Sequence, residues 1–187
     1  MRKVFKIIIV SVLILFVVIV GALGLVVLDV AGAFATGTHT LPNGAAVGTA
    51  LVVYDPGLSG GAKDAATKIG YNLQSGGYTV VLAGVKSSTA ANVTSYDVVV
   101  VGGPIYGGQA SSSVRGYLSD LDSTPGTKVG VFGFGSVRID DGDLVSVMNE
   151  VAPLPNSSSL SIDAVAKIVS GNSMDKQCSD FVTELLN

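Results

Sequence analysis

The chain has 187 residues, which is long enough for one domain of ordinary size with a buried core. Beyond residue 35 it carries eight Lys and Arg against 13 Asp and Glu, and this acidic excess argues against nucleic acid and against an anionic membrane surface as partners. Its single cysteine, Cys178, excludes an internal disulfide and any metal site built from several cysteines. Yet 48% of all residues are hydrophobic and only 13% are charged, which is unusual for a wholly soluble protein.

The start of the chain explains this apolar composition. Residues 7–28 form an apolar run of 22 residues in which Ser11 is the only polar side chain. As a helix this run would be ~33 Å long, slightly more than the ~30 Å hydrocarbon core of a bilayer. We therefore predict a cytoplasmic start and a transmembrane signal-anchor within residues 1–29. A cleaved secretory signal is the alternative, because residues 33–36 (AFAT) offer an A-x-A cleavage site, although the apolar part of such signals is usually ~7–15 residues.

The distribution of cations predicts the orientation of this segment. Arg2, Lys3 and Lys6 precede the apolar run, and no further cation follows until Lys63. The positive-inside rule then places the N-terminus in the cytoplasm and the remainder outside it. The prediction is a single-pass membrane protein with an extracytoplasmic domain, or a secreted protein if the chain is cleaved near Ala35.

Residues 30–48 are small, polar and rich in glycine, and they show no periodicity. We predict a flexible linker here, followed by one domain over residues 49–187. In that domain short apolar runs alternate with amphipathic segments at helical spacing. The predicted strands are Ala50–Tyr54, Tyr78–Leu82, Asp97–Gly102, Lys128–Phe132 and, more weakly, Ser161–Val169. The predicted helices lie at 62–73, 114–121, 144–151 and 178–185, and residues 88–94 form no more than a helical turn.

This alternation predicts an α/β fold. Because βαβ crossovers are right-handed, the order indicates a three-layer sandwich around a five-stranded parallel sheet with strand order 2-1-3-4-5. In such a sheet ligands bind at the carboxyl ends of the first and third strands, where the winding direction reverses.

The loop after the first strand, DPGLSGGAKDAAT at 55–67, has several possible functions. Residues 57–61 match the G-x-S-x-G nucleophile elbow, but the only histidine, His39, lies upstream in the linker. A Walker A loop is excluded because Ala62 replaces its second glycine and Asp64 its hydroxyl residue. A looser phosphate cradle remains, in which glycines and a helix N-terminus present backbone N–H groups and Ser59 adds a hydroxyl. An ordinary βα corner remains the alternative.

Two further glycine-rich loops follow the third and fourth strands. They read GGPIYGG at 102–108 and FGFGS at 132–136, and they contribute the aromatic residues Tyr106 and Phe134. The carboxyl ends of parallel strands share one edge of the sheet, so we expect these loops to lie beside the first. Anion donors and aromatic surfaces together suit a planar phosphorylated ligand.

The segments LVVYDPGLSGGAKDAATKI, YDVVVVGGPIYGG and KVGVFGFGS resemble those of flavodoxins and flavodoxin-domain proteins over nearly all of residues 49–187. The resemblance implies non-covalent FMN, with a phosphate loop, an isoalloxazine border in which Tyr106 stacks, and a lining on the other side of the ring. By position these cofactor-binding residues would be Gly57, Leu58, Ser59, Gly60, Gly61, Ala62, Gly103, Pro104, Ile105, Tyr106, Gly107, Gly108, Phe134, Gly135 and Ser136.

The chain departs from this family in the phosphate loop. Ser59 is its only hydroxyl, and Ala62 stands where the family usually has a closing threonine. Asp55 would repel a phosphate dianion unless its carboxylate faces away.

These features predict a membrane-tethered electron carrier that binds FMN, with no essential catalytic side chain and no metal site. Its acidic charge would suit a basic redox partner protein at the membrane. A flavin-dependent oxidoreductase of the quinone or protoporphyrinogen type is one alternative. The other is a binding module that has kept the fold and lost FMN.

Overall fold

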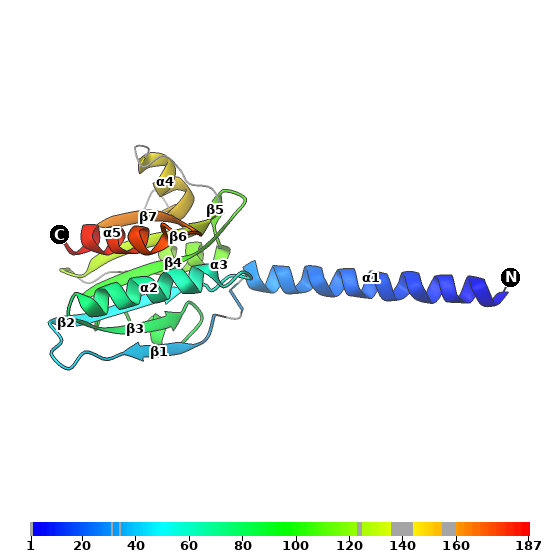
Figure 1. Cartoon of the computed structure of the whole chain (residues 1–187), viewed down its shortest axis with the longest axis horizontal. Helices are drawn as coiled ribbons and strands as arrows, with labels where there is room; N and C mark the ends of the chain where they lie inside the picture. The colour runs from blue at the N-terminus through cyan, green and yellow to red at the C-terminus, as the bar shows by residue number, and fades with distance from the viewer. Residues whose placement is uncertain (1, 31, 34, 123–124, 136–143, 155–159) are drawn as a thin grey trace.

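The computed structural model describes residues 2–30, 32–33, 35–122, 125–135, 144–154 and 160–187. Helix α1 (Arg2–Val30) extends away from an α/β domain that contains the other elements (Figure 1). Within α1, Phe5–Leu28 has a mean hydropathy of 3.2 and none of it is buried against the domain, so it is long and apolar enough to cross a membrane.

The centre of the domain is a sheet whose five main strands run parallel. The order β3-β2-β4-β6-β7 is the predicted 2-1-3-4-5 arrangement, so the predicted fold class is confirmed. Two short antiparallel strands, which the sequence analysis missed, pair with β3 and β4 and bring the sheet to seven strands. The strands are β1 (Thr38–Leu41), β2 (Gly48–Tyr54), β3 (Tyr78–Gly84), β4 (Val98–Tyr106), β5 (Gln109–Ala110), β6 (Lys128–Gly135) and β7 (Ala164–Val169).

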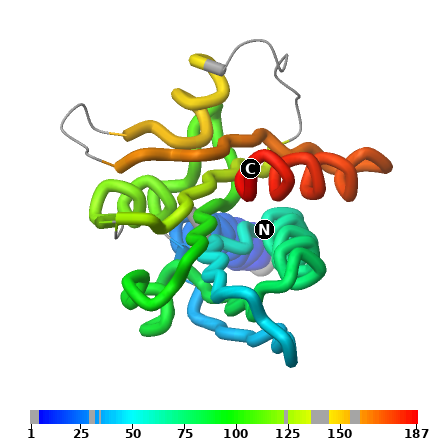
Figure 2. Tube along the Cα trace, turned by 90° about the vertical axis from the view of Figure 1, so that its left-hand side faces the viewer, coloured from blue at the N-terminus to red at the C-terminus, as the bar shows by residue number. Residues whose placement is uncertain are grey.

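Helices cover both faces of this sheet, because the central strands are apolar on both sides. Helices α2 (Gly61–Ser75) and α5 (Met174–Leu186) lie side by side on one face, and α3 (Ser112–Asp120) lies on the other (Figure 2). The second face also holds α4 (Leu144–Val151) and, between β3 and β4, the single turn η1 (Thr89–Ala91). The predicted helices and the helical turn are therefore present.

The prediction of a flexible linker over residues 30–48 is wrong for much of that segment. Thr38–Leu41 forms β1, which pairs antiparallel with β3 along the edge of the sheet. Ala35 and Leu41 are buried in the two cores. An edge strand such as β3 has unpaired backbone groups that a neighbouring segment can satisfy, and the domain consequently begins well before residue 49.

Cys178 is buried on the face of α5 that packs against α2, as its position on an apolar stripe suggests. Desolvation by burial raises the pKa of its thiol to about 11. We expect no reaction of the folded chain with Ellman's reagent at pH 8, since the thiolate is the reactive form. One thiol should react after unfolding in guanidinium. Rapid labelling of the folded chain would show that α5 does not stay packed on α2.

Candidate functional site

The carboxyl ends of β2, β4 and β6 bring the three glycine-rich segments together, as predicted. A Cβ atom placed on Gly57 would lie 3.0 Å from Pro104 Cγ and 3.2 Å from the hydroxyl oxygen of Tyr106. A Cβ atom on Gly61 would lie 2.3 Å from the ring of Phe134. Tyr106 and Phe134 therefore lie at two ends of the same loop, which we call the α2 loop (residues 57–62).

Glycine is required in the α2 loop for conformational reasons. Gly57 and Gly60 have φ angles of 62° and 72°, in the left-handed region that other residues rarely adopt. Gly60 is the N-cap of α2, and no side chain makes a capping hydrogen bond there. The first turn of α2 therefore lacks the acceptor that an N-cap side chain usually supplies to its amides.

Several amides of the α2 loop have acceptors within the chain. The N–H of Gly57 donates to the Asp55 carboxylate at 3.1 Å, and that of Leu58 to the Tyr106 hydroxyl at 3.4 Å. The N–H of Gly61 donates to the Ser59 hydroxyl at 3.3 Å. The structure describes all of residues 57–63, and three backbone N–H groups among them have no hydrogen-bond acceptor within the described chain: those of Ser59, Ala62 and Lys63.

Two of the predicted loops are partly strand. Gly103–Tyr106 belongs to β4, and only Gly107 and Gly108 form the turn to β5, with φ angles of 59° and 80°. This pair of left-handed residues is typical of a tight hairpin turn. Likewise Phe134 and Gly135 end β6.

Some glycines that we expected to admit a ligand instead allow internal packing. A Cβ atom on Gly103 would lie 2.7 Å from Val114 Cγ2 and 2.9 Å from Asp55 Cβ. The side chain of Ile105 packs across Gly133, where a Cβ atom would lie 2.6 Å away. Gly103, Pro104 and Ile105 thus shape the core beneath the site, while Gly107 and Gly108 are exposed.

Asp55 does face away from the open side of the α2 loop. Its side chain is 1% exposed. Besides the Gly57 amide, its carboxylate accepts a hydrogen bond from Ser111 Oγ at 2.9 Å and another from Ser113 Oγ. The carboxylate therefore links the α2 loop to the first turn of α3 and compensates its own burial with three donors.

A charged pair near the site was not predicted. Lys167 on β7 and Glu150 on α4 form an ion pair of 2.6 Å, with side chains that are 8% and 13% exposed. The Lys167 side chain runs beneath Gly135, where a Cβ atom would lie 3.1 Å from Lys167 Cε. The sequence signal was available, since Lys167 is a charged residue inside a predicted strand. Ser136, the last predicted site residue, lies outside the described residues.

Solved structures of similar fold include flavodoxins. A flavodoxin 2 from Bacillus cereus is 20% identical with a TM-score of 0.52, and the similarity covers 74% of this chain and 97% of that one. A flavodoxin from Streptococcus pneumoniae is 19% identical with a TM-score of 0.51, and the similarity covers 74% of this chain and 97% of that one. A short-chain flavodoxin associated with a bacterial microcompartment is 16% identical with a TM-score of 0.53, and the similarity covers 74% of this chain and 95% of that one.

The domain has a flavodoxin-like fold. At these identities the similarity shows the fold alone. No family model matches the sequence, and no curated protein matches it.

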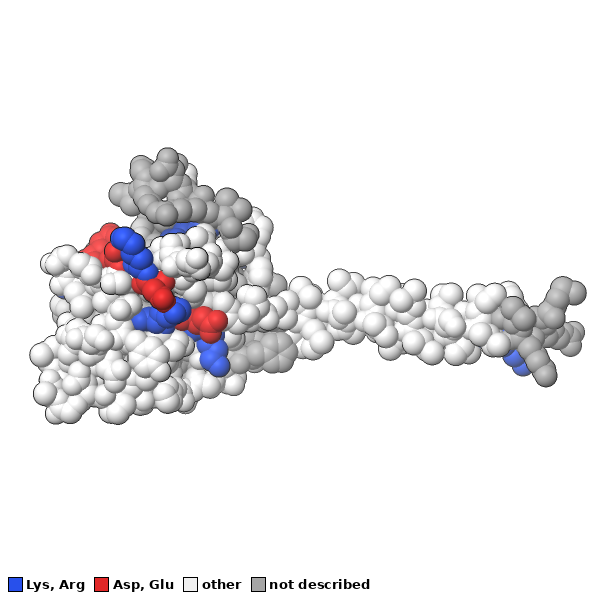
Figure 3. Space-filling model, in the orientation of Figure 1, with Lys and Arg blue, Asp and Glu red and all other residues white. Residues whose placement is uncertain are grey.

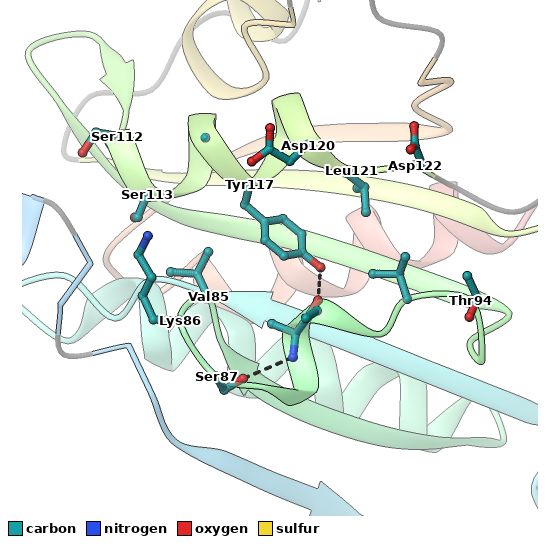
Figure 4. A pocket seen from close by; sticks show the side chains of 14 residues that line it. Val85, Lys86, Ser87, Thr94, Ser112, Ser113, Tyr117, Asp120, Leu121 and Asp122 are labelled. Atoms are coloured by element: carbon teal, nitrogen blue, oxygen red, sulfur yellow. Dashed lines mark hydrogen bonds between the residues drawn. The ribbon is translucent and has the colours of Figure 1, made fainter.

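The flavodoxin-like domain has a cavity of about 670 Å³ between η1 and α3 (Figure 4). Its wall includes Val85, Lys86 and Tyr117, and the Tyr117 hydroxyl donates a 2.6 Å hydrogen bond to the carbonyl of Ala90. Burial raises the pKa of Tyr117 to about 12, so this phenol stays protonated and continues to donate. The cavity follows from the replacement of a crossover helix by the single turn η1, and it is separate from the α2 loop.

Charges of both signs lie on the visible face of the flavodoxin-like domain. In Figure 3 lysines and acidic residues gather over α2 and α5. Two ion pairs there are Lys68 with Asp175, between the helices, and Lys176 with Asp180 at 2.5 Å within α5. This face therefore presents alternating signs rather than a uniformly acidic surface.

Proposed function

We propose that the flavodoxin-like domain binds FMN at the α2 loop and takes part in electron transfer while α1 anchors it to a membrane. The observation that carries this proposal is the uncapped N-terminus of α2, which lies between Tyr106 and Phe134 at the carboxyl edge of the sheet. This is where ligands bind in open α/β sheets.

The phosphate would be held by the unpaired amides of Ser59, Ala62 and Lys63. They belong to a glycine-rich turn and the first turn of a helix, where the helix dipole also favours negative charge. The Asp55 carboxylate is buried and accepts hydrogen bonds from two hydroxyls at the start of α3 as well as from the Gly57 amide. These three donors offset part of its repulsion of an anion here. The residues present thus fit a phosphate group, with fewer hydroxyl donors than the family usually supplies.

The ring would lie beside Tyr106 and the exposed turn at Gly107 and Gly108. Tyr106 is half-buried, and its hydroxyl bond to Leu58 fixes its position against the α2 loop. Phe134 would border the phosphate end, since its ring contacts Gly61. When bound, the flavin supplies the redox chemistry, and the protein supplies position and electrostatic environment.

A binding module without flavin is the second candidate, and one observation favours it. The amides of Gly57, Leu58 and Gly61 already have acceptors in Asp55, Tyr106 and Ser59. A loop that satisfies its own donors needs no phosphate to order it. A flavin-dependent oxidoreductase would instead be identified by steady-state turnover with NAD(P)H or a quinol.

Retention of α1 is supported by the position of Ala35. This residue is 2% exposed, and its carbonyl accepts a 2.8 Å hydrogen bond from the Lys86 amide. Cleavage at the A-x-A site near Ala35 would remove these contacts. With α1 retained, the cations before it favour a cytoplasmic N-terminus and an extracytoplasmic domain. A basic redox partner protein at the membrane is also part of the proposal.

Titration of the full chain in detergent with FMN and with riboflavin tests the function, with flavin fluorescence quenching as the readout. We expect saturable FMN binding at least ~10-fold tighter than riboflavin binding, because charge-assisted hydrogen bonds are the stronger ones. Tyr106→Ala should weaken binding about tenfold through loss of stacking, whereas Tyr106→Phe should retain it. Tyr71→Ala, at an exposed tyrosine of α2, is the control. If the folded chain caused no quenching, FMN binding would be contradicted and the binding module without flavin would remain as the candidate function.

A further inference from the structure

Three described residues between α1 and β1 are docked on the carboxyl edge of the sheet: Gly32, Ala35 and Gly37. The Gly84 amide donates to the carbonyl of Gly37 at 2.7 Å, and the Lys86 amide to that of Ala35 at 2.8 Å. Gly84 ends β3, so both bonds lie at the carboxyl end of that strand. A Cβ atom on Gly32 would lie 2.6 Å from Ser113 Cβ, at the start of α3.

The same segment is tied directly to the end of the apolar run. The amide of Ala33 donates a 3.0 Å hydrogen bond to the carbonyl of Leu28, the last residue of the candidate span. Gly32 lies four residues beyond Leu28, and four residues reach at most ~14 Å even when fully extended. The distance from the end of the span to the carboxyl edge is therefore short, and the connection is not a long flexible linker.

We infer that the carboxyl edge of the sheet lies against the lipid headgroups, with the α2 loop and the β4–β5 turn facing the bilayer. This inference rests on the proposed anchoring by α1 but not on flavin binding. At this edge Leu58, at the tip of the α2 loop, is 59% exposed. An apolar side chain exposed on a loop beside a membrane-spanning helix is suited to the interfacial region.

The charges of the described residues are distributed accordingly. Lys63, Lys86 and Arg115 lie at or near the carboxyl edge, since they follow β3 or occupy the first turns of α2 and α3. Acidic residues lie at the opposite edge, before β4 and β7 or at the end of α3: Asp97, Asp120, Asp122 and Asp163. The acidic residues at 140, 141 and 143 are outside the described residues and do not enter this comparison. Two described acidic residues, Asp64 and Asp175, lie at the carboxyl edge, in the first turns of α2 and α5, and Asp175 is paired with Lys68. The carboxyl edge is therefore the less acidic of the two edges, although it carries carboxylates.

One consequence concerns access to the candidate site. A site that opens toward the bilayer is reached from the membrane surface, so its ligand or electron partner has to approach along that surface. The opposite edge of the sheet remains in water.

Spin labels on the full chain in phosphatidylcholine nanodiscs test this orientation. Labels at Leu58→Cys and Lys86→Cys report on the carboxyl edge, and only Leu58 belongs to the candidate flavin site. Val47→Cys is the matched control, an apolar residue that is 76% exposed at the opposite edge, directly before β2. Cys178 is buried and should not compete for the label. Collision with oxygen, which is enriched in lipid, is compared with collision with a water-soluble nickel chelate.

We expect the oxygen-to-nickel accessibility ratio at positions 58 and 86 to be at least threefold that at position 47. Equal, water-like ratios at all three positions would overturn the inference, and so would a higher ratio at position 47. A chain that fails to enter nanodiscs would overturn it together with the anchoring. Because the readout requires no flavin, a chain that binds no FMN but shows the expected ratios would contradict only the proposed cofactor.

Discussion

Replacement of Asp55 by alanine should lower the free energy of unfolding by about 3 kcal/mol, because three buried donors lose their acceptor. These donors are the amide of Gly57 and the hydroxyls of Ser111 and Ser113. The two hydroxyls lie 3.0 Å apart and can still bond to each other, which limits the loss. Urea unfolding of the full chain in detergent, followed by far-UV circular dichroism, measures the effect.

Two control variants separate the buried network from general effects of charge removal. Asp55→Asn keeps the shape and an acceptor for Gly57, and its amide can donate to the serine hydroxyls, so it should lose less than half as much stability as alanine. Asp122→Ala removes an exposed carboxylate and should stay within ~0.5 kcal/mol of the parent chain. Equal losses for Asp55→Ala and Asp122→Ala would mean that the carboxylate does not hold the α2 loop to α3.

Gly84→Ala should detach the segment between α1 and β1 from the sheet. A Cβ atom at this position would lie 2.3 Å from both the carbonyl carbon and the carbonyl oxygen of Ala35. The obstacle is backbone, so the segment has to move and its hydrogen bonds to Gly84 and Lys86 are weakened. We expect a loss of about 2 kcal/mol in the same urea experiment, typical of overpacking at a close contact.

The matched control for this substitution is Gly116→Ala. Gly116 lies inside α3, and a Cβ atom there would meet nothing within 4 Å. Alanine is the better helix former by ~1 kcal/mol, so this variant should be as stable as the parent chain or slightly more so. If Gly84→Ala were equally neutral, the contacts of the docked segment would contribute nothing to the free energy of unfolding. The short connection between α1 and the carboxyl edge would then not be fixed by these contacts.

The two substitutions should also differ in their effect on the candidate site. Asp55 is bonded to the α2 loop itself, whereas Gly84 contacts only the segment that leads to α1. Loss of FMN binding is therefore expected from Asp55→Ala, and a change in spin-label accessibility from Gly84→Ala.

The fold class and the strand order of the main sheet follow from the sequence alone. Runs such as Val98–Val101 are apolar on both faces, which requires helices on both sides. The handedness of βαβ crossovers then leaves few arrangements. The glycine-rich loop was located between the first strand and the first helix, and the left-handed φ angles of Gly57 and Gly60 there are a local requirement that glycine meets.

The roles of residues that act through distant partners became clear only from their tertiary contacts. Asp55 was predicted as a potential source of repulsion, but Ser111 and Ser113, more than fifty residues away, bind its carboxylate. Gly103 was assigned to a ligand border, yet it is required by the packing of Val114. The linker seemed structureless because β1 is short, and its stability comes from the edge of β3 rather than from its own residues. Local patterns specify local conformation and burial, whereas these assignments depend on contacts that form only when the sheet has assembled.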